Sequence, residues 1–412
     1  MDRTVIVVGA GMAGLACADG LRAAGWQPIV LEAAARPGGR VGSQRHPSGH
    51  LIDRGFQVLF SAYPTVGRVL DLPALDLRAY DAGALVRVGG AWRPFANPFA
   101  HPGDAFGSAT AGLIQPADAL ALARLALEAG LGGGSPGLST REYLARLGFS
   151  EVFVNRFLSP FFSGIWLDRT LDVEASVFRF YWRLLLLGRA VVPTGGMQAL
   201  PDQLAGRLPV GALRLGTQVA ALHRTEGRVT GVVLTDGQRL EAAHVVLATP
   251  PHETARLLDE APAVRGKAAL TLYFSAAKAP FARRLIALSP DPASPVGIVA
   301  VPSNVVRACA PAGEHQVAVQ ALPVEGRGLG LAPDEALRIL DGWFPGAAGW
   351  RFLEAVTVPF AQFDQAPGSG RLPLRHPAGV LVASEATGQS SIEGAVAGGT
   401  AAARALGAPP SL

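Results

Sequence analysis

Apolar residues form two short runs at the start of the chain, separated by a longer stretch rich in Ala and Leu. The first run, Thr4 to Val8, is mostly β-branched, which is typical of a buried parallel strand. The Ala/Leu stretch has helical character and ends at Gly25, a residue that commonly stops a helix. Pro28 to Leu31 is the second apolar run. The pattern therefore predicts a strand, a helix and a second strand that pair in a parallel sheet.

Three glycines fill the turn between the first strand and the helix, at Gly9, Gly11 and Gly14. The first permits a tight turn, the second lets backbone N–H groups approach a diphosphate, and the third lets helix and strand pack closely. Glu32 stands at the end of the second strand, where a carboxylate can bind ribose hydroxyls. The spacing predicts a dinucleotide site, because an unrelated glycine turn would leave Glu32 unexplained.

A second glycine cluster, Arg36-Pro37-Gly38-Gly39-Arg40, follows the acid almost at once. This R-x-G-G-R stretch resembles the second fingerprint of the flavin-containing amine oxidase superfamily, which includes amine oxidases, protoporphyrinogen oxidases and phytoene desaturases. The resemblance implies an FAD site in which Gly38 and Gly39 pass near the diphosphate and Arg40 helps to neutralise it. Glu32 and its neighbour Ala33 are expected in the same site.

Two further segments resemble the same superfamily. The stretch after R-x-G-G-R implies that Gly55, Phe56 and Gln57 lie near the isoalloxazine ring. A middle segment, residues 213–251, reads as strands joined by tight Glu-Gly and Asp-Gly turns. By the same resemblance, the backbone around Val219 contacts the adenine end of the cofactor.

The C-terminal segment, residues 379–406, completes the resemblance. A short apolar strand leads to Glu385, which the resemblance assigns to the ribityl or diphosphate part of FAD; the superfamily usually has Gly where this chain has Ser384. Ser391 and Ile392 then open a helix whose N-terminus is expected to face the flavin pyrimidine. The dipole of such a helix stabilises negative charge on the reduced cofactor.

Departures from the amine oxidases favour another branch of the superfamily. Amine oxidases typically carry a lysine near flavin N5 on a strand of the substrate domain. The corresponding strand here has Thr271 and Leu272, with Lys267 just before it and Lys278 past its end. The aromatic side chain that walls an amine cage is also missing, and no cysteine lies near residues 365–400 to attach flavin covalently. The chain is therefore closest in character to the phytoene/carotenoid desaturase and protoporphyrinogen oxidase branch, with non-covalent FAD and an apolar substrate.

The remaining stretches leave alternatives open. Residues 98–188 have helical character, and residues 151–189 are rich in Phe, Trp and Leu with arginines between them. This region is interpreted as a helical core that also lines an apolar substrate cavity, and peripheral membrane contact is the alternative. Residues 256–369 read as a strand-rich sheet with one helix, and Phe360 and Phe363 either wall the substrate site or belong to the core.

Two smaller groups of polar residues are also ambiguous. Asp53 and Arg54 form either part of the flavin segment or a surface pair at a turn. His252 follows Pro-Pro and could approach the cofactor. The preferred interpretation is that it does not.

Composition narrows the class of protein. The chain has 412 residues, 49% hydrophobic and 17% charged, which fits two or three domains. No uncharged apolar run reaches the roughly 18 residues that a transmembrane helix needs. The net charge is only +4 and the cations are scattered, so no nucleic-acid partner is expected.

Cysteine and histidine usage predicts neither disulfides nor a metal site. Cys17 and Cys309 stand alone, and the eight histidines show no metal-ligand spacing. Asp2 and Arg3 lead directly into the first strand, which does not resemble a signal peptide. A cytoplasmic location is therefore expected.

Together these features predict an α/β fold: a doubly wound, glutathione-reductase-like Rossmann domain for FAD, and a substrate domain with a mixed sheet and a helical lobe. The expected domain boundaries are 1–80, 190–255 and 370–412 for the FAD domain, and 81–189 and 256–369 for the substrate domain.

The expected function is FAD-dependent dehydrogenation (desaturation) of a lipophilic substrate such as a carotenoid-like polyene. Flavin carries such chemistry itself, so no catalytic side chain is predicted. The alternatives are a flavin amine oxidase, a redox-neutral polyene isomerase that uses reduced FAD, and a non-enzymatic FAD-bound carrier of lipid or pigment.

Overall fold

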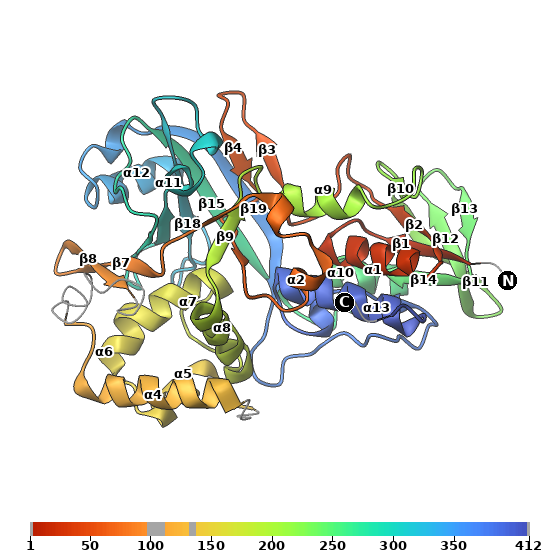
Figure 1. The fold of residues 1–412 in the computed structure, drawn as a ribbon, viewed down its shortest axis with the longest axis horizontal. Coiled ribbons are helices and arrows are strands. Elements are labelled where there is room, and N and C mark those ends of the chain that lie inside the picture. Colours follow the sequence, from red (N-terminus) through yellow and green to blue (C-terminus); the bar gives the residue numbers. More distant parts are fainter. Residues whose placement is uncertain (1–2, 97–111, 132–136, 410–412) are drawn as a thin grey trace.

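The computed structural model describes residues 3–96, 112–131 and 137–409. A five-stranded parallel sheet joins distant parts of the chain in the order β10–β2–β1–β14–β20 (Figure 1). Its strands, in that order, are Leu213–Arg214, Gln27–Leu31, Thr4–Val8, His244–Leu247 and Leu381–Val382. The predicted strand–helix–strand unit is confirmed by β1, helix α1 (Met12–Ala23) and β2.

The two faces of the parallel sheet have different covers, because successive strand residues point to opposite sides. Val5 packs in one hydrophobic cluster with helices α1 and α13 (Ile392–Ala405). Ile6 packs in another cluster with an antiparallel sheet, β11–β12–β13, and helix α10. These elements span Val219–Thr225, Arg228–Leu234, Arg239–Glu241 and Pro251–Leu258.

Small residues allow α1 and α13 to pack closely. A Cβ added to Gly399 would lie 2.1 Å from the carbonyl oxygen of Ala13, and one added to Gly20 would lie 2.9 Å from Ala403 Cβ. The C-terminal helix is therefore held directly against the first helix of the chain, although the two are far apart in sequence.

A seven-stranded mixed sheet forms the second half of the molecule, in the order β19–β15–β18–β17–β16–β7–β8. All its pairs are antiparallel except β16 with β7. The strands, in that order, are Arg351–Phe363, Gly266–Ala276, His315–Ala321, Val296–Ala300, Ile286–Leu288, Gly83–Val88 and Ala91–Ala96. Helix α12 (Pro333–Asp341) packs on one face, and its start at Pro333 agrees with the sequence.

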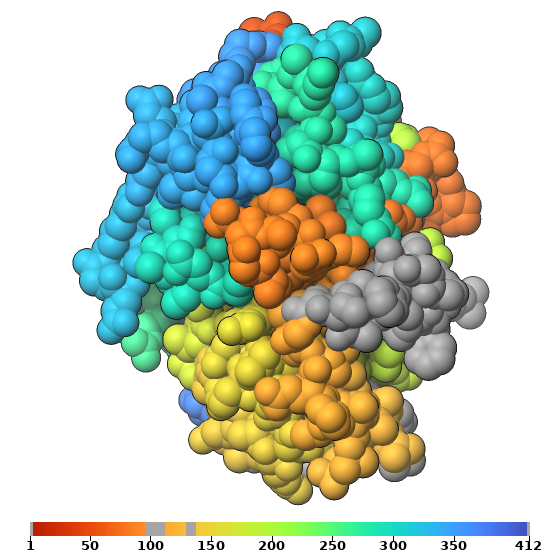
Figure 2. Space-filling view, turned by 90° about the vertical axis from the view of Figure 1, so that its left-hand side faces the viewer, coloured from red at the N-terminus to blue at the C-terminus, as the bar shows by residue number. Residues whose placement is uncertain are grey.

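A helical lobe lies next to this sheet, with the β7–β8 hairpin between them (Figure 2, lobe in yellow, hairpin in orange). Its helices α4, α5, α6, α7 and α8 span Pro116–Leu131, Thr140–Leu147, Glu151–Phe153, Ser159–Trp166 and Ala175–Leu187. Aromatic rings fill its interior: the Phe162 ring centroid lies 4.7 Å from that of Trp166 and 4.9 Å from that of Phe178. The aromatic residues of this segment therefore form a core, as one interpretation expected.

Short elements complete the fold. They are the β3–β4 hairpin (Ser43–Arg45, Leu51–Asp53), the β5–β9–β6 sheet (Leu59–Phe60, Ala190–Pro193, Leu77–Ala79), and helices α2 (Val66–Val69), α9 (Ala199–Ala205) and α11 (Pro302–Val305).

The predicted α/β fold class is confirmed. The expected domain boundaries stay a prediction, although every strand of the parallel sheet comes from the segments 1–80, 190–255 and 370–412. Part of the stretch expected to be helical, residues 97–111, lies outside the described residues. Among the helices of the described ranges, none is both long and apolar enough to cross a membrane.

Candidate functional site

A cavity of about 770 Å³ runs between the parallel sheet, the seven-stranded sheet and the helical lobe. One end lies beside the carboxyl ends of β1 and β2, which is where α/β folds place their ligands. All residues predicted to bind the cofactor line this cavity except Gly14. They are Gly9, Gly11, Glu32, Ala33, Gly38, Gly39, Arg40, Gly55, Phe56, Gln57, Val219, Glu385, Ser391 and Ile392. The structure brings these residues together, and their part in cofactor binding stays a prediction.

The three glycines of the first turn have different steric roles. Gly9 has a φ of +105°, and a Cβ there would lie 2.7 Å from the Ala248 carbonyl oxygen. A Cβ on Gly14 would lie 2.0 Å from the Gly9 carbonyl oxygen, so Gly14 lets α1 pack against the turn without facing the cavity. A Cβ on Gly11 would meet no heavy atom within 4 Å. Only Gly11 therefore leaves space that a ligand could fill.

The Glu32 carboxylate is fixed at the end of β2 by two backbone groups. The Ala10 N–H donates to Oε2 at 2.7 Å, and the Ala34 N–H donates to Oε1 at 2.9 Å. A carboxylate has about four acceptor positions, so further donors can still bind. The fixed orientation suits recognition of a hydroxyl pair at this end of the cavity.

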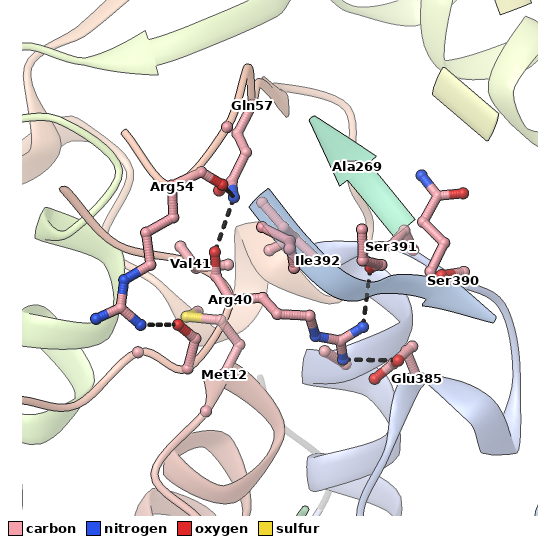
Figure 3. A pocket seen from close by; sticks show the side chains of 18 of the residues that line it. Met12, Arg40, Val41, Arg54, Gln57, Ala269, Glu385, Ser390, Ser391 and Ile392 are labelled. Carbon is pink, nitrogen blue, oxygen red and sulfur yellow. Dashed lines mark hydrogen bonds and ion pairs between the residues drawn. The ribbon is translucent and has the colours of Figure 1, made fainter. Parts of the chain in front are cut away.

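Arg40 and Glu385 form an ion pair at 2.6 Å between Nη2 and Oε1 (Figure 3). The Arg40 guanidinium also donates to the Ala361 carbonyl oxygen at 3.0 Å. The resemblance found in the sequence assigned both charged residues to the cofactor. In the structure they also form an ion pair with each other. The pair joins the N-terminal glycine cluster to the C-terminal segment across the cavity wall.

Gln57 anchors the segment expected near the flavin ring. Its Nε2 donates to the carbonyl oxygens of Arg40 at 2.8 Å and Arg54 at 2.9 Å (Figure 3). Next to it, the Phe56 N–H donates to Thr271 Oγ1 at 3.2 Å. The loop is thereby attached both to the glycine cluster and to strand β15 of the other sheet.

Helix α13 begins at the cavity. Ser391 Oγ accepts from the Gly394 N–H at 2.8 Å, which caps the helix. The buried Glu393 carboxylate accepts from the N–H groups of Thr65 and Val66 at 2.8 and 2.9 Å. The N-terminus of a 14-residue helix is thus fixed beside Ile392 on the cavity wall, where its dipole favours negative charge.

The far end of the cavity is apolar. Its wall includes side chains from the helical lobe and the seven-stranded sheet: Phe161, Ile165, Leu167, Leu185, Ile286 and Ile298. This arrangement suits a hydrocarbon chain, because such side chains exclude water and offer dispersion contacts without hydrogen bonds.

Sequence analysis missed two glutamines of this wall. Gln320 Nε2 donates to the Gly164 carbonyl oxygen at 3.1 Å, and Gln362 Nε2 donates to that of Ile165. Both carbonyls belong to the last turn of α7, where a helix leaves its carbonyls without partners. A signal was available: Gln316 and Gln320 stand four residues apart in an otherwise apolar strand, on the same face.

Lys267 is not where the sequence placed it. It lies inside strand β15 rather than before it, and its Nζ pairs with Asp168 at 2.6 Å and approaches Asp364 at 4.0 Å. The strand positions that line the cavity are Ala269 and Thr271. Lys278 lies beyond the end of the strand. Neither lysine of the chain lines the cavity.

The alternatives for the aromatic residues of β19 are resolved in favour of the core. Phe363 is buried in a cluster with Val264 and Ala386, and Phe360 packs against that cluster rather than lining the cavity. His252, which was the less favoured candidate, does line the cavity and has its ring 5.3 Å from that of Phe360.

Asp53 and Arg54 are not a surface pair. The Asp53 carboxylate lies inside the protein and accepts from Ser43 Oγ at 2.5 Å and from the Met197 N–H at 3.1 Å. Arg54 instead donates to the Gly39 carbonyl oxygen. Burial raises the pKa of Asp53 to about 6, against the smaller opposing effect of these two hydrogen bonds.

The raised pKa of Asp53 predicts a pH-dependent stability. The folded protein holds the Asp53 proton more tightly than the unfolded chain does, so this stabilisation is complete below the unfolded pKa of 3.8 and is lost as the pH rises through about 6. The difference corresponds to about 3 kcal/mol. Urea unfolding between pH 4 and 7.5 should show it, and Asp53→Asn should remove this part of the pH dependence. Asp236→Asn, at an exposed turn, is the control and should leave the slope unchanged; an unchanged slope in Asp53→Asn would contradict the prediction.

Among the described residues there is no group of three or more His, Cys, Asp or Glu side chains arranged to hold a metal ion. Cys17 and Cys309 are both free and buried, and burial raises the pKa of each thiol to about 12.

The fold and site define an α/β protein in which the carboxyl ends of a parallel sheet open into a large, mostly apolar cavity. A family model described as flavin containing amine oxidoreductase matches residues 12–275. This is more than half of the chain, and the chain belongs to that family. Proteins of this family contain a flavin, and the cavity fits such a cofactor: Gly11 leaves open space, Glu32 offers a fixed carboxylate, and the N-terminus of α13 favours negative charge.

Similar curated proteins include carotenoid desaturases. Hydroxyneurosporene desaturase of Cereibacter sphaeroides is 31% identical over 283 residues, which cover 60% of this chain and 56% of the relative. Phytoene dehydrogenase of Streptomyces griseus is 29% identical over 299 residues, covering 63% and 56%. The chain therefore spans about half the length of the curated relatives it matches.

Solved structures with the same fold include proteins named for different activities. A putative protoporphyrinogen oxidase from Exiguobacterium sp. 255-15 has a TM-score of 0.74 at 17% identity, covering 98% of this chain and 99% of its own. Putrescine oxidase bound to putrescine has a TM-score of 0.69 at 18% identity, covering 98% and 99%. At these identities the likeness shows the fold alone.

Proposed function

We propose that this protein is an FAD-dependent oxidoreductase that removes hydrogen from a lipophilic polyene, with the FAD held non-covalently. The observation that carries the proposal is that one continuous cavity is glycine-lined and polar at one end and apolar at the other. The similarity to two proteins named as a carotenoid desaturase and a phytoene dehydrogenase supports this substrate class.

Each end of the cavity has a distinct task. Glu32 would bind the ribose hydroxyls, the backbone at Gly11 would bind the diphosphate, and Arg40 would supply positive charge. A flavin held there would supply two-electron oxidation, in which the substrate loses one hydrogen as a hydride to the flavin and a second hydrogen as a proton to solvent. The side chains of Phe161 and Ile298 would exclude water and align the apolar chain.

An amine oxidase is the less favoured alternative. Both lysines lie outside the cavity wall, and Lys267 is held by Asp168. The positions at the start of α13 are Ser391 and Ile392, which offer a cation no aromatic face.

Peripheral membrane contact through residues 151–189 remains part of the proposal. Leu186 and Leu187 are 50% and 67% exposed at the end of α8, next to the cavity-lining residues Gly188 and Arg189. Exposed leucines beside arginine suit a lipid headgroup interface. A lipophilic substrate could then enter from the membrane surface.

Anaerobic absorption spectroscopy of the purified holoprotein tests the function. The flavin bands are expected to bleach when a long polyene is added, with a product two hydrogens lighter, and to stay unchanged with a primary amine. Bleaching with the amine alone would establish the oxidase alternative. A polyene product of unchanged mass, formed only after prior reduction, would establish the isomerase, and a flavin that no substrate or reductant reaches would establish the carrier.

A further inference from the structure

A second, much smaller cavity of about 30 Å³ adjoins the main one. Phe56, Gln57 and Tyr80 line both cavities and therefore form the wall between them. Asp53 and Gln316 line the small cavity and not the main one. The segment expected beside the flavin ring thus has the main cavity on one side and an acidic side chain on the other.

The Asp53 carboxylate has one oxygen that is held and one that is open. Oδ1 accepts both hydrogen bonds, from Ser43 Oγ at 2.5 Å and from the Met197 N–H at 3.1 Å. Oδ2 has no hydrogen-bond partner in the described part of the chain, yet it does not belong to the unpartnered polar atoms that are sealed from solvent. Since the small cavity has room for about one water molecule, a proton can reach Oδ2 through it.

No cation faces the Asp53 carboxylate from the described residues. The titratable groups around it are Tyr80, Tyr273 on β15, and Cys309, and burial raises the pKa of all three, with a smaller contribution from the charge of Asp53. All three are therefore neutral at pH 7. Arg54, the next residue, donates to a backbone carbonyl of the glycine cluster instead. A buried carboxylate without a counter-ion binds a proton readily when further negative charge appears near it.

We propose that Asp53 takes up a proton from solvent, through the small cavity, whenever a flavin in the main cavity is reduced. The inference rests on the proposed function for the presence of a flavin beside Gln57, and it adds a site that holds a proton. In turnover the substrate gives a hydride to the flavin and a proton to solvent, while Asp53 binds one solvent proton and releases it when the flavin is oxidised again.

The size of the effect follows from electrostatics. Reduction adds negative charge to the flavin, which the N-terminus of α13 favours. One such charge at roughly 10 Å raises the proton affinity of a carboxylate about 10-fold at an effective dielectric constant of about 20. Burial raises the pKa of Asp53 to about 6. At pH 7 about one Asp53 in ten is therefore protonated before reduction and about one in two afterwards.

Electrochemical reduction of the flavin-loaded protein tests the inference without any substrate. The infrared difference spectrum between the reduced and the oxidised protein at pH 7 is expected to gain the C=O band of a protonated carboxylic acid. A pH indicator in the same sample should record about 0.4 proton more per flavin than in Asp53→Asn. Asparagine keeps an oxygen for the bonds from Ser43 and Met197 but takes up no proton, so its spectrum should lack the band.

Asp81→Asn is the matched control. Asp81 lines the main cavity, but its carboxylate pairs with Arg284 at 2.9 Å, so its replacement should keep both the band and the proton uptake. A second measurement needs no variant: wild-type protein with a heavy carbon isotope in its aspartate carboxyl groups should show the band at lower frequency, which a glutamate band would not do.

The outcomes separate the inference from the proposed function. A band that is absent from the wild type, persists in Asp53→Asn, disappears in Asp81→Asn or is not moved by the labelled aspartate would overturn the inference, as would equal proton uptake in the wild type and Asp53→Asn. A band that depends on Asp53, in a protein whose flavin no polyene bleaches, would uphold the inference while the proposed dehydrogenation fails. A protein that binds no flavin would overturn both.

Discussion

Gly11→Val is expected to yield a folded protein that purifies without flavin, with affinity for added FAD reduced by about 100-fold or more. Gly11 has an extended backbone, with φ of −70° and ψ of 176°, which valine adopts without strain. A Cβ added there meets no protein heavy atom within 4 Å, so the new side chain extends into the open space of the cavity beside the N-terminus of α1. Flavin absorbance of the purified variant and a titration with FAD measure the effect.

Gly14→Val is expected to destabilise the fold rather than to block the cofactor site directly. Its Cβ would lie 2.0 Å from the Gly9 carbonyl oxygen and 3.0 Å from Ala248 Cβ, so α1 would have to move away from the turn. Such overpacking costs about 3 kcal/mol or more of unfolding free energy, which urea unfolding of the apoprotein measures. Gly330→Val, where a Cβ also meets nothing, is the control and should retain both flavin and stability. Full flavin content in Gly11→Val would show that this turn is not part of the cofactor site.

Arg40→Met is expected to destabilise the apoprotein by about 3 kcal/mol. The Glu385 side chain is only 5% exposed and would lose the cation that lies 2.6 Å away. A carboxylate left unpaired in such a place is far more costly than the pair itself is stabilising. Arg40→Met/Glu385→Gln should recover part of the loss, because the remaining side chain is neutral.

Urea unfolding of the wild type, the two single variants and the double variant at pH 7 closes the cycle without involving the cofactor. Arg78→Met is the matched control: Arg78 pairs with Asp76 at 2.9 Å, but both side chains are more than half exposed, so its loss should change the free energy of unfolding by about 0.5 kcal/mol or less. If Arg40→Met were no more destabilising than Arg78→Met, the Arg40–Glu385 pair would not stabilise the cavity wall.

Much of the cofactor end could be predicted because it depends on local geometry. Gly9 has a φ of +105°, and a Cβ on Gly14 would lie 2.0 Å from the Gly9 carbonyl oxygen, so the turn itself already requires glycine at both positions. The acid at the end of β2 and the helix start at Ser391 are likewise set by neighbours along the chain. Local pattern thus determined the α/β class and the glycine turn, whereas Arg40, Val219 and Glu385 were assigned to the same site only by the resemblance to the amine oxidase superfamily.

Residues whose partners lie far away could not be assigned in this way. Lys267 was expected just before the strand that contains Thr271. It lies inside that strand, and its ion pair with Asp168 depends on how the helical lobe meets the sheet. The Asp53 carboxylate accepts a hydrogen bond from the N–H of Met197, which is remote in the sequence, and nothing in the residues beside Asp53 indicates this.

By itself, the sequence determined the strand–helix–strand unit, the glycine turn and the fold class, because 3.6- and 2-residue periodicity and glycine sterics act between near neighbours. Only the tertiary structure decided that Arg40 pairs with Glu385, that Phe363 belongs to the core, and that Gln320 leaves an unpaired oxygen in an apolar wall. These outcomes depend on distances between elements that are remote in the chain, which packing of the two sheets and the helical lobe sets and local pattern does not.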